Sequence, residues 1–227
     1  RKGTTCLDCM LQNWKEITPQ TIINHLMGKI TIGIYPLLSD DTCRFLVFDF
    51  DNHTKKSEQT DFSNEDEKWK EEVSALREIC KINHIDALVE RSRSGNGAHV
   101  WIFFEQPITA EKARKFGNAL LDKGAESVNL QNFRYYDRMI PAQDYLKNGG
   151  LGNLIALPLQ PEALKNGNSA FVDDNWNAYP NQYEVLFSKH RLTAQEIEQM
   201  MTEWSGINPF ENRMNVKNAR NKSWENQ

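Results

Sequence analysis

Two aspartates, two residues apart, end an apolar segment in a spacing that suits a metal ion. Residues 44–51 read Arg-Phe-Leu-Val-Phe-Asp-Phe-Asp, which predicts a buried central strand. Residues two apart on a strand point to the same face, so Asp49 and Asp51 share a side with Val47. Their carboxylates, about 7 Å apart along the strand, repel each other unless a cation compensates them. Oxygen-only sites of this kind suit Mg²⁺ or Mn²⁺. The alternative interpretation is that the two acids only mark a solvated strand end.

A loop rich in serine and glycine provides a second candidate element. Its glycines let backbone N–H groups approach a phosphate, and a histidine at the start of the next strand would project beside it. The lysine followed by Ser or Thr that a Walker A loop requires is missing. Such a loop can hold a triphosphate, although Gly-Asn-Gly is also common in hairpin turns. The candidate nucleotide-binding residues are Arg93, Ser94, Gly95, Asn96, Gly97 and His99.

A third carboxylate is expected because two bridging divalent cations carry four positive charges. The segment Phe-Val-Asp-Asp at 171–174 repeats the arrangement of an apolar strand that ends in acids. Asp173 is therefore the candidate and Asp174 the alternative, while a simple turn is the competing interpretation. Lys165 and Asn168, just upstream, could reach a phosphate or a sugar.

The elements that must position these residues alternate between strands and helices. Apolar positions spaced by four, three and four residues predict a long helix over 64–80, opened by a capping box at Asn64 and Glu67. The segment 127–152 gives no clear pattern. The mixture predicts an α+β fold. The expected helices are 19–27, 64–80, 109–123 and 193–204, and the further expected strands are 31–38, 85–90, 99–104, 153–159 and 169–172.

Composition and charge limit the class of protein. The 227 residues are 39% apolar and carry 27 basic against 31 acidic side chains, which is ordinary for a globular protein and excludes a fibrous or disordered chain. Residues 40–72 alone hold 11 acids and 5 bases, so the acidic excess lies around the candidate metal carboxylates. Two divalent cations would offset much of it, and the net charge of −4 does not argue against nucleic-acid binding.

Targeting signals and cysteine usage favour a cytoplasmic protein. No apolar segment approaches the roughly 20 residues that span a bilayer, so no membrane contact is expected, and the first residues are not a secretory signal. The sequence begins without methionine, which suggests a piece of a larger multidomain protein. Four cysteines are too few for a disulfide scaffold and favour a reducing compartment. Cys6 and Cys9 form a CxxC, half of a structural zinc site, with an ordinary loop as the alternative.

Taken in order, the segments 32–38, 48–51, 90–104, 152–160 and 167–173 resemble a known family. The likeness is to the archaeo-eukaryotic primase superfamily, and more closely to the prokaryotic primase-polymerases of TOTE conflict systems and their CRISPR-associated relatives. It covers roughly residues 6–192. In that family a CxxC often belongs to a zinc-binding element just before the catalytic core.

The resemblance implies an RRM-like catalytic palm fused to an N-terminal αβ unit. It divides the chain into an N-terminal segment (1–28), a primase-polymerase core (29–192) and a C-terminal helix with a tail (193–227). It implies an enzyme that starts primers de novo on single-stranded DNA and extends the primer strand with NTPs or dNTPs. By motif position, Asp49, Asp51 and Asp173 would bind two Mn²⁺ or Mg²⁺ ions, and Ser94 and His99 would bind the incoming triphosphate.

Two other classes of protein remain open at this point. A phosphohydrolase of the haloacid dehalogenase type also has a DxD at a strand end, but it requires Thr or Val two residues after the second aspartate, where this chain has His53. A non-catalytic RRM-like nucleic-acid-binding module relies on exposed aromatic residues on the sheet. Here the matching positions carry carboxylates, which would repel phosphate in the absence of metal.

Overall fold

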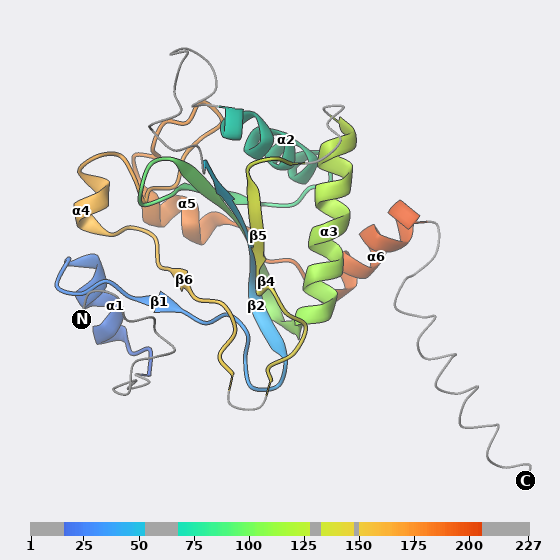
Figure 1. The fold of residues 1–227 in the computed structure, drawn as a ribbon, viewed down its shortest axis with the longest axis horizontal. Helices are drawn as coiled ribbons and strands as arrows, with labels where there is room; N and C mark the ends of the chain where they lie inside the picture. Colours follow the sequence, from blue (N-terminus) through green and yellow to red (C-terminus); the bar gives the residue numbers. More distant parts are fainter. Residues whose placement is uncertain (1–15, 53–67, 128–132, 148–149, 206–227) are drawn as a thin grey trace, which may run out of the picture.

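A four-stranded antiparallel sheet forms the centre of the protein, in the order β3-β4-β2-β5 (Figure 1). The computed structural model describes residues 16–52, 68–127, 133–147 and 150–205. The long strands β2 (Thr42–Asp51) and β4 (Gly97–Thr109) lie side by side in the middle, and the short strands β3 (Leu88–Arg91) and β5 (Tyr136–Ile140) form the edges.

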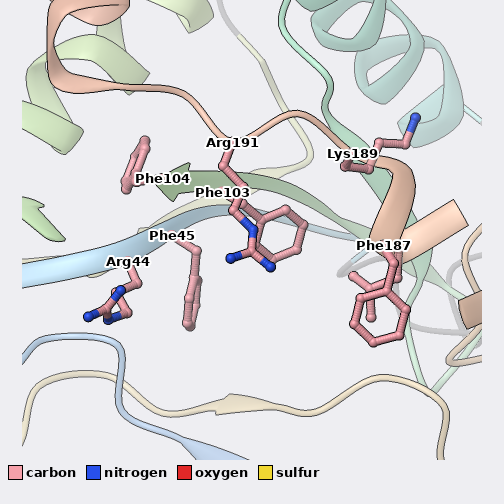
Figure 2. Close-up of a pocket in the computed structure, with 8 residues that line it drawn as sticks. Arg44, Phe45, Phe103, Phe104, Phe187, Lys189 and Arg191 are labelled. Carbon is pink, nitrogen blue, oxygen red and sulfur yellow. The ribbon is translucent and has the colours of Figure 1, made fainter. Parts of the chain in front are cut away.

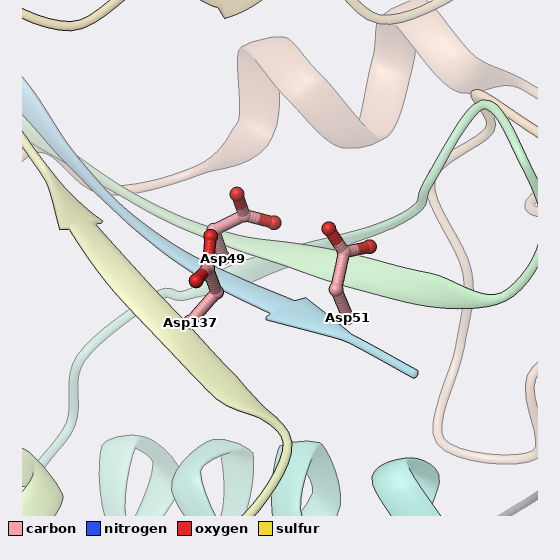
Figure 3. A group of neighbouring side chains, drawn as sticks. All are labelled: Asp49, Asp51 and Asp137. Atoms are coloured by element: carbon pink, nitrogen blue, oxygen red, sulfur yellow. The ribbon is translucent and has the colours of Figure 1, made fainter. Parts of the chain in front are cut away.

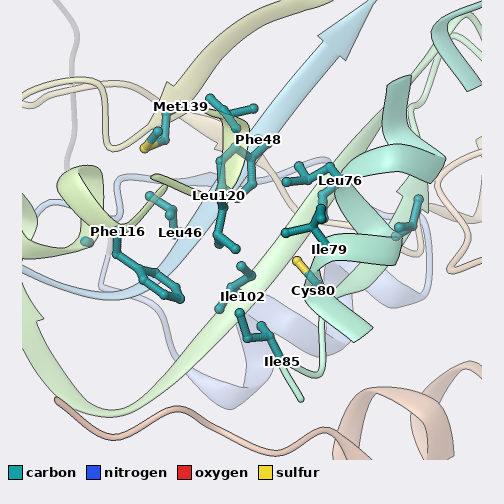
Figure 4. Close-up of a cluster of buried hydrophobic side chains, with 14 of the residues drawn as sticks. Leu46, Phe48, Leu76, Ile79, Cys80, Ile85, Ile102, Phe116, Leu120 and Met139 are labelled. Atoms are coloured by element: carbon teal, nitrogen blue, oxygen red, sulfur yellow. The ribbon is translucent and has the colours of Figure 1, made fainter. Parts of the chain in front are cut away.

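One face of this sheet is covered by helices. The helices α2 (Lys68–Ile82) and α3 (Ala110–Ser127) pack on it, and α6 (Ala194–Ser205) lies against α3 (Figure 1). Alternate apolar residues of the strands point into this layer, so the period-2 pattern of β2 and the helical periodicity of α2 together make the main core (Figure 4). Members of that core include Leu46, Phe48, Leu76, Ile102 and Phe116.

The other face is partly covered by smaller elements from both ends of the chain. The helix α1 (Pro19–Leu26) begins after Thr18, whose side chain accepts a hydrogen bond from the N–H of Thr21. It is followed by β1 (Gly33–Ile34), which pairs with β6 (Ile155–Ala156). The short helices α4 (Pro161–Leu164) and α5 (Gln182–Ser188) complete this side. A second apolar cluster, which includes Val47 and Trp101, packs here.

The predicted α+β fold is confirmed, with differences in particular elements. Strands β2 and β3 and helices α1, α2, α3 and α6 appear close to where the sequence predicts them, whereas β4 continues through Pro107 to Thr109. The expected strands 31–38 and 153–159 are wrong in length, since only two residues of each pair. The expected strand 169–172 is reduced to isolated bridges. Strand β5 and helices α4 and α5 were not predicted.

Several expectations lie outside the described residues or stay predictions. Cys6 and Cys9, and with them the zinc half-site, belong to the undescribed part of the chain, as does the capping box that was expected to open α2. The division at residues 28 and 192 stays a prediction. Cys43 and Cys80 are buried free thiols, and burial raises the pKa of each to about 12. Among the described residues, none of the helices combines the length and apolar character that a membrane crossing requires.

Candidate active site

Three carboxylates from two neighbouring strands meet on the face of the sheet opposite α2 and α3. Asp49 and Asp51 lie near the end of β2, and Asp137 lies near the start of β5 (Figure 3). Each offers an oxygen within 4.8 Å of the others, and all three side chains are half-buried. Among the described residues, this is the one group of three or more acidic, histidine or cysteine side chains with the geometry for a shared metal ion.

The local backbone explains why Asp137 joins the other two. Alternation along β2 directs both aspartates to the same face, as predicted. In the adjacent antiparallel ladder Asp49 pairs with Arg138 and Phe50 pairs with Tyr136, so the register shifts at this point and Asp137 is the extra residue of a bulge. A bulge re-aims the side chain that it carries. The irregularity in β5 therefore accompanies the convergence of the three acids.

The carboxylate cluster has the chemistry of a cation site. Oδ1 of Asp49 is buried and accepts no hydrogen bond from the protein. Its nearest cationic atom is Nε2 of His99, at 3.5 Å, which is too far for a good hydrogen bond. A buried carboxylate oxygen without a donor is costly, and a hard divalent cation bound by oxygen ligands removes that cost. The three acids therefore fit a Mg²⁺- or Mn²⁺-type ion.

His99 lies directly beside the cluster and is held by a buried glutamate. Its Nδ1 lies 2.9 Å from Oε2 of Glu90, while its Nε2 faces Asp49. Burial alone would lower the pKa of His99, but the side-chain contacts with Asp49 and Glu90 and the negative charges of both acids outweigh it and raise that pKa to about 10. The raised pKa favours the imidazolium form of the ring, whose Nε2 faces the acidic site.

Glu90 is itself fixed by three donors. Besides His99, it accepts hydrogen bonds from Nε1 of Trp101 at 3.1 Å and from Oγ of Ser169 at 3.3 Å. Only 3% of its side chain is exposed. Because all three partners come from side chains on this face of the sheet, Glu90 fixes the direction in which the His99 ring points.

The serine- and glycine-rich loop connects β3 to β4 next to His99. Gly97 is packed against β2 so closely that a Cβ would lie 2.1 Å from the carbonyl oxygen of Phe50. Gly95 has a φ of +80°, which favours glycine. The Ser94 hydroxyl accepts a hydrogen bond from the N–H of Asn96 at 3.2 Å. Exposed residues Arg93, Ser94 and Asn96 thus form a surface loop with accessible donors.

The residues expected upstream of Asp173 have different positions. Asn168 lies against the loop, since its Nδ2 donates to the carbonyl of Arg93 at 3.4 Å. A Cβ added to Gly95 would lie 2.8 Å from the side-chain oxygen of Asn168. Lys165 instead forms an exposed ion pair with Glu162 on α4. The structure therefore joins Asn168 to the candidate phosphate loop through a hydrogen bond, whereas the Lys165 ammonium pairs with Glu162.

The structure does not bring Asp173 to the other carboxylates, which corrects the expected triad. Oδ1 of Asp173 accepts the N–H groups of Asn175 and Asn177, both at 2.9 Å, as in the turn that was the competing interpretation. Asp174 pairs with Arg77 at 3.0 Å and with Lys81, and these cations lower its pKa. Asp137 occupies the place in the cluster that the sequence assigned to Asp173.

Sequence reasoning missed Asp137, Glu90 and Arg138. The guanidinium of Arg138 donates to Asp137 at 2.6 Å. That hydrogen bond and the charges of the aspartates raise the pKa of Arg138. The signal for Asp137 was an acid inside a Tyr-Asp-Arg-Met-Ile segment, but it lay in the unassigned stretch 127–152. The signal for Glu90 was an acid at the end of a predicted buried strand, two positions before the serine-rich loop.

Fold and site together give an α+β domain with a carboxylate cluster that could hold a metal ion, beside a histidine and a loop rich in serine and glycine. A model of the archaeo-eukaryotic primase domain of TOTE conflict systems matches residues 1–200. The chain therefore belongs to this primase family, as the motifs of its sequence predicted, and carries a nucleotidyltransferase-type primase domain. A comparison with curated proteins finds no match.

Proposed function

We propose that this protein is a primase-polymerase that starts primers de novo on single-stranded DNA and extends them from NTPs or dNTPs. The observation that carries the proposal is the convergence of Asp49, Asp51 and Asp137 beside His99 and the loop that precedes it. Membership of the primase family supports the same chemistry. Nucleotide transfer to a growing strand requires both a polyphosphate site and a cation site, and the loop with His99 and the adjacent aspartates are the candidates for the two.

The three aspartates are the proposed ligands of two divalent cations, with Asp137 in the position first assigned to Asp173. When bound, the cations would lower the pKa of the attacking hydroxyl and neutralise charge on the leaving pyrophosphate. The protein supplies the carboxylates on two paired strands, so their spacing is fixed by the ladder rather than by a mobile loop.

The loop and His99 are proposed to hold the incoming nucleotide. Arg93 and the Ser94 hydroxyl, with the backbone N–H groups of Gly95, Asn96 and Gly97, provide donors for phosphate oxygens. His99 is proposed to donate from Nε2 to the phosphates while its Nδ1–H stays hydrogen-bonded to Glu90. Glu90 is therefore a positioning residue. Asn168 supports the loop from behind, and Lys165 is proposed to reach the phosphates or sugar only by leaving Glu162.

The transfer step conserves atoms and electrons without any redox partner. The 3′-hydroxyl oxygen of the primer, or of an initiating nucleotide, attacks the α-phosphorus of the incoming nucleotide. A new oxygen–phosphorus bond forms, the bond from the α-phosphorus to the bridging oxygen breaks, and pyrophosphate leaves with that electron pair. The hydroxyl proton passes to solvent, while Nε2–H of His99 is proposed to donate to the phosphate oxygens.

The direct test measures incorporation of labelled nucleotide on a single-stranded template with Mn²⁺ or Mg²⁺. Asp49→Asn and Asp51→Asn keep side-chain size and remove charge, so each should reduce incorporation about 1,000-fold. Chelation by EDTA should abolish it. Asp122→Asn is the matched control, because Asp122 is an exposed aspartate on α3. Retained synthesis in the Asp49→Asn/Asp51→Asn double variant would refute the proposal.

A second readout separates template-directed synthesis from simple hydrolysis. The proposal expects products whose length and sequence follow the template and expects pyrophosphate as the by-product. Release of inorganic phosphate from a phosphomonoester without any template would instead identify a phosphohydrolase. Strand binding that is insensitive to EDTA, with no nucleotidyl transfer, would identify a non-catalytic binding module.

A further inference from the structure

A hollow with aromatic walls and basic side chains lies at the other end of the sheet face that carries the aspartates. It has a volume of about 220 Å³ and lies between the start of β2, the middle of β4 and the segment that follows α5 (Figure 2). Half of the residues that line it are phenylalanines, among them Phe45, Phe103 and Phe187. The described residues that line it include three basic side chains and no acidic one.

Two arginines give this hollow its charge. In Figure 2 the guanidinium groups of Arg44 and Arg191 lie on either side of Phe45, whereas the amine of Lys189 points away from the rings. Within the described part of the chain, neither arginine forms an ion pair with a carboxylate. Both are exposed. Two arginines on one wall, with no acid beside them, suit successive phosphates better than an apolar or cationic ligand.

An exposed ring completes the chemistry of the hollow. The side chain of Phe187 is 75% exposed, the largest exposure among the large hydrophobic residues of the described chain. A phenylalanine in water, next to arginines, offers a flat surface on which a nucleic-acid base can stack. Leu186 and Phe187 also line a second, apolar cavity of about 310 Å³ that continues beneath the same rings.

A row of rings connects the hollow to the aspartate cluster. His99 lies 6.3 Å from Trp101, and Trp101 lies 6.3 Å from Phe103 and 5.4 Å from Phe45, measured between ring centroids. Phe45 precedes Asp49 by four residues on the same strand, which corresponds to about 13 Å. Trp101 is only 3% exposed, so this row is packed beneath the elements that cover the face, and it fixes the distance between the hollow and the candidate metal site.

We infer that this hollow binds single-stranded nucleic acid, with phosphates on Arg44 and Arg191 and a base on Phe187. The inference rests on the proposed function, because the hollow would supply a further contact for the strand that the enzyme copies or extends. A nucleoside monophosphate carries a single phosphate group and would not need two separated arginines. An acidic peptide would satisfy the charge but would leave the exposed ring without a matching planar group.

The test measures the binding of a fluorescein-labelled oligothymidylate by anisotropy in EDTA, so that the metal site does not contribute. Arg44→Ala/Arg191→Ala should weaken binding and reduce the slope of log K against log salt by about 1.4, as expected for two lost contacts to a single strand. Phe187→Ala should weaken binding about 5- to 150-fold. Lys115→Ala and Ile82→Ala are the matched controls, because they remove a positive charge from α3 and an exposed apolar side chain from α2.

The results also separate this inference from the proposed function. Binding and salt slope that stay at wild-type values in Arg44→Ala/Arg191→Ala, or binding that stays at the wild-type value in Phe187→Ala, would overturn the inference. Full displacement of the oligonucleotide by equimolar dTMP would overturn it as well. The Asp49→Asn/Asp51→Asn variant should still bind the strand in EDTA, at least as tightly as wild type, because it removes two charges that repel phosphate. If no variant or wild-type protein incorporates nucleotide while the hollow variants lose binding, the proposed function fails and the strand site stands.

Discussion

The two faces of the four-stranded sheet are built from alternate residues of the same strands, yet they have opposite properties. On β2, Leu46, Phe48 and Phe50 are fully buried beneath the helices. On the other face Val47 is equally buried, but the next two positions are the half-buried Asp49 and Asp51. One ten-residue strand thus supports the core with one set of side chains and the site with the other.

A buried glutamate serves each face, and the donors around the two carboxylates differ. Glu90 accepts from side chains of the site, including His99 and Trp101. Glu72, on α2, accepts from the backbone N–H groups of Arg134 and Tyr135, at 2.8 and 2.9 Å. Glu72 therefore fixes the path of the chain into β5, whereas Glu90 fixes the orientation of a ring. The comparison predicts that one face controls chemistry and the other controls stability.

The largest expected effect is on the site face, at the third carboxylate. Asp137→Asn should reduce nucleotide incorporation about 1,000-fold, because it removes a charge from the proposed cation site. The protein should remain folded, since the substitution relieves repulsion among three acids. Asp173→Asn is the matched control, because an asparagine oxygen can accept the same two backbone N–H groups. Nucleotide incorporation and thermal unfolding would be measured for both variants. Loss of activity in Asp173→Asn with activity kept in Asp137→Asn would contradict this assignment.

On the helix-covered face the effect should be on stability alone. Phe116 is fully buried on α3 and stacks with Trp204, with ring centroids 5.8 Å apart. Phe116→Ala should cost about 3–5 kcal/mol of unfolding free energy and lower Tm by roughly 6–20 °C. Activity per folded molecule should stay at the wild-type level when measured well below the new Tm. A loss of kcat in fully folded Phe116→Ala protein would show that the two faces are not independent.

The same contrast explains how much of the molecule could be predicted from sequence. The apolar alternation that predicted β2 also assigned Asp49 and Asp51 to one face, because a buried strand leaves a strong period-2 pattern. Strand β5 gave no such pattern, since it is five residues long, lies at the edge of the sheet and carries a bulge. Asp137 was therefore missed, because its position depends on pairing with a strand distant in sequence.

The error at Asp173 has a similar physical origin. An apolar segment that ends in acids has the same sequence pattern whether it enters a sheet or a turn. Residues 171–174 make only isolated bridges, and the Asp173 carboxylate caps its own turn. Local sequence therefore predicted an acid after an apolar segment, but not the long-range contacts that decide which acid joins the cluster.

An intermediate effect is expected when the two buried glutamates are compared directly. Glu90→Gln should raise the KM for nucleotide and lower kcat, because the amide no longer fixes the His99 ring. Together these changes should reduce kcat/KM about 10- to 100-fold. Glu72→Gln should lower Tm and leave the KM unchanged, because its donors belong to the backbone near β5. Steady-state kinetics and thermal unfolding of both variants would measure this. Equal shifts of KM in the two variants would remove the distinction between them.

The smallest expected effect is a difference in how stability depends on pH. Burial raises the pKa of Glu72 above its ordinary 4.5, so its contribution is full below that pH and is lost as the pH rises through the higher folded value. Lys81 and Arg77 lower the pKa of Asp174 below 3.8, so its contribution is present above that pH and is lost as the pH falls through the lower folded value. Solvent screens the exposed Asp174 pair and keeps its effect small.

Urea unfolding across acidic and neutral pH would measure both slopes as differences from wild type. The deficit of Glu72→Gln should be largest at acidic pH and shrink as the pH rises above about 4.5, because wild type must then ionise a buried carboxyl group. The deficit of Asp174→Asn should run the other way and disappear only below about 3.8. Parallel curves for the two variants would mean that burial does not dominate at Glu72, and that its two backbone donors compensate the ionised carboxylate fully.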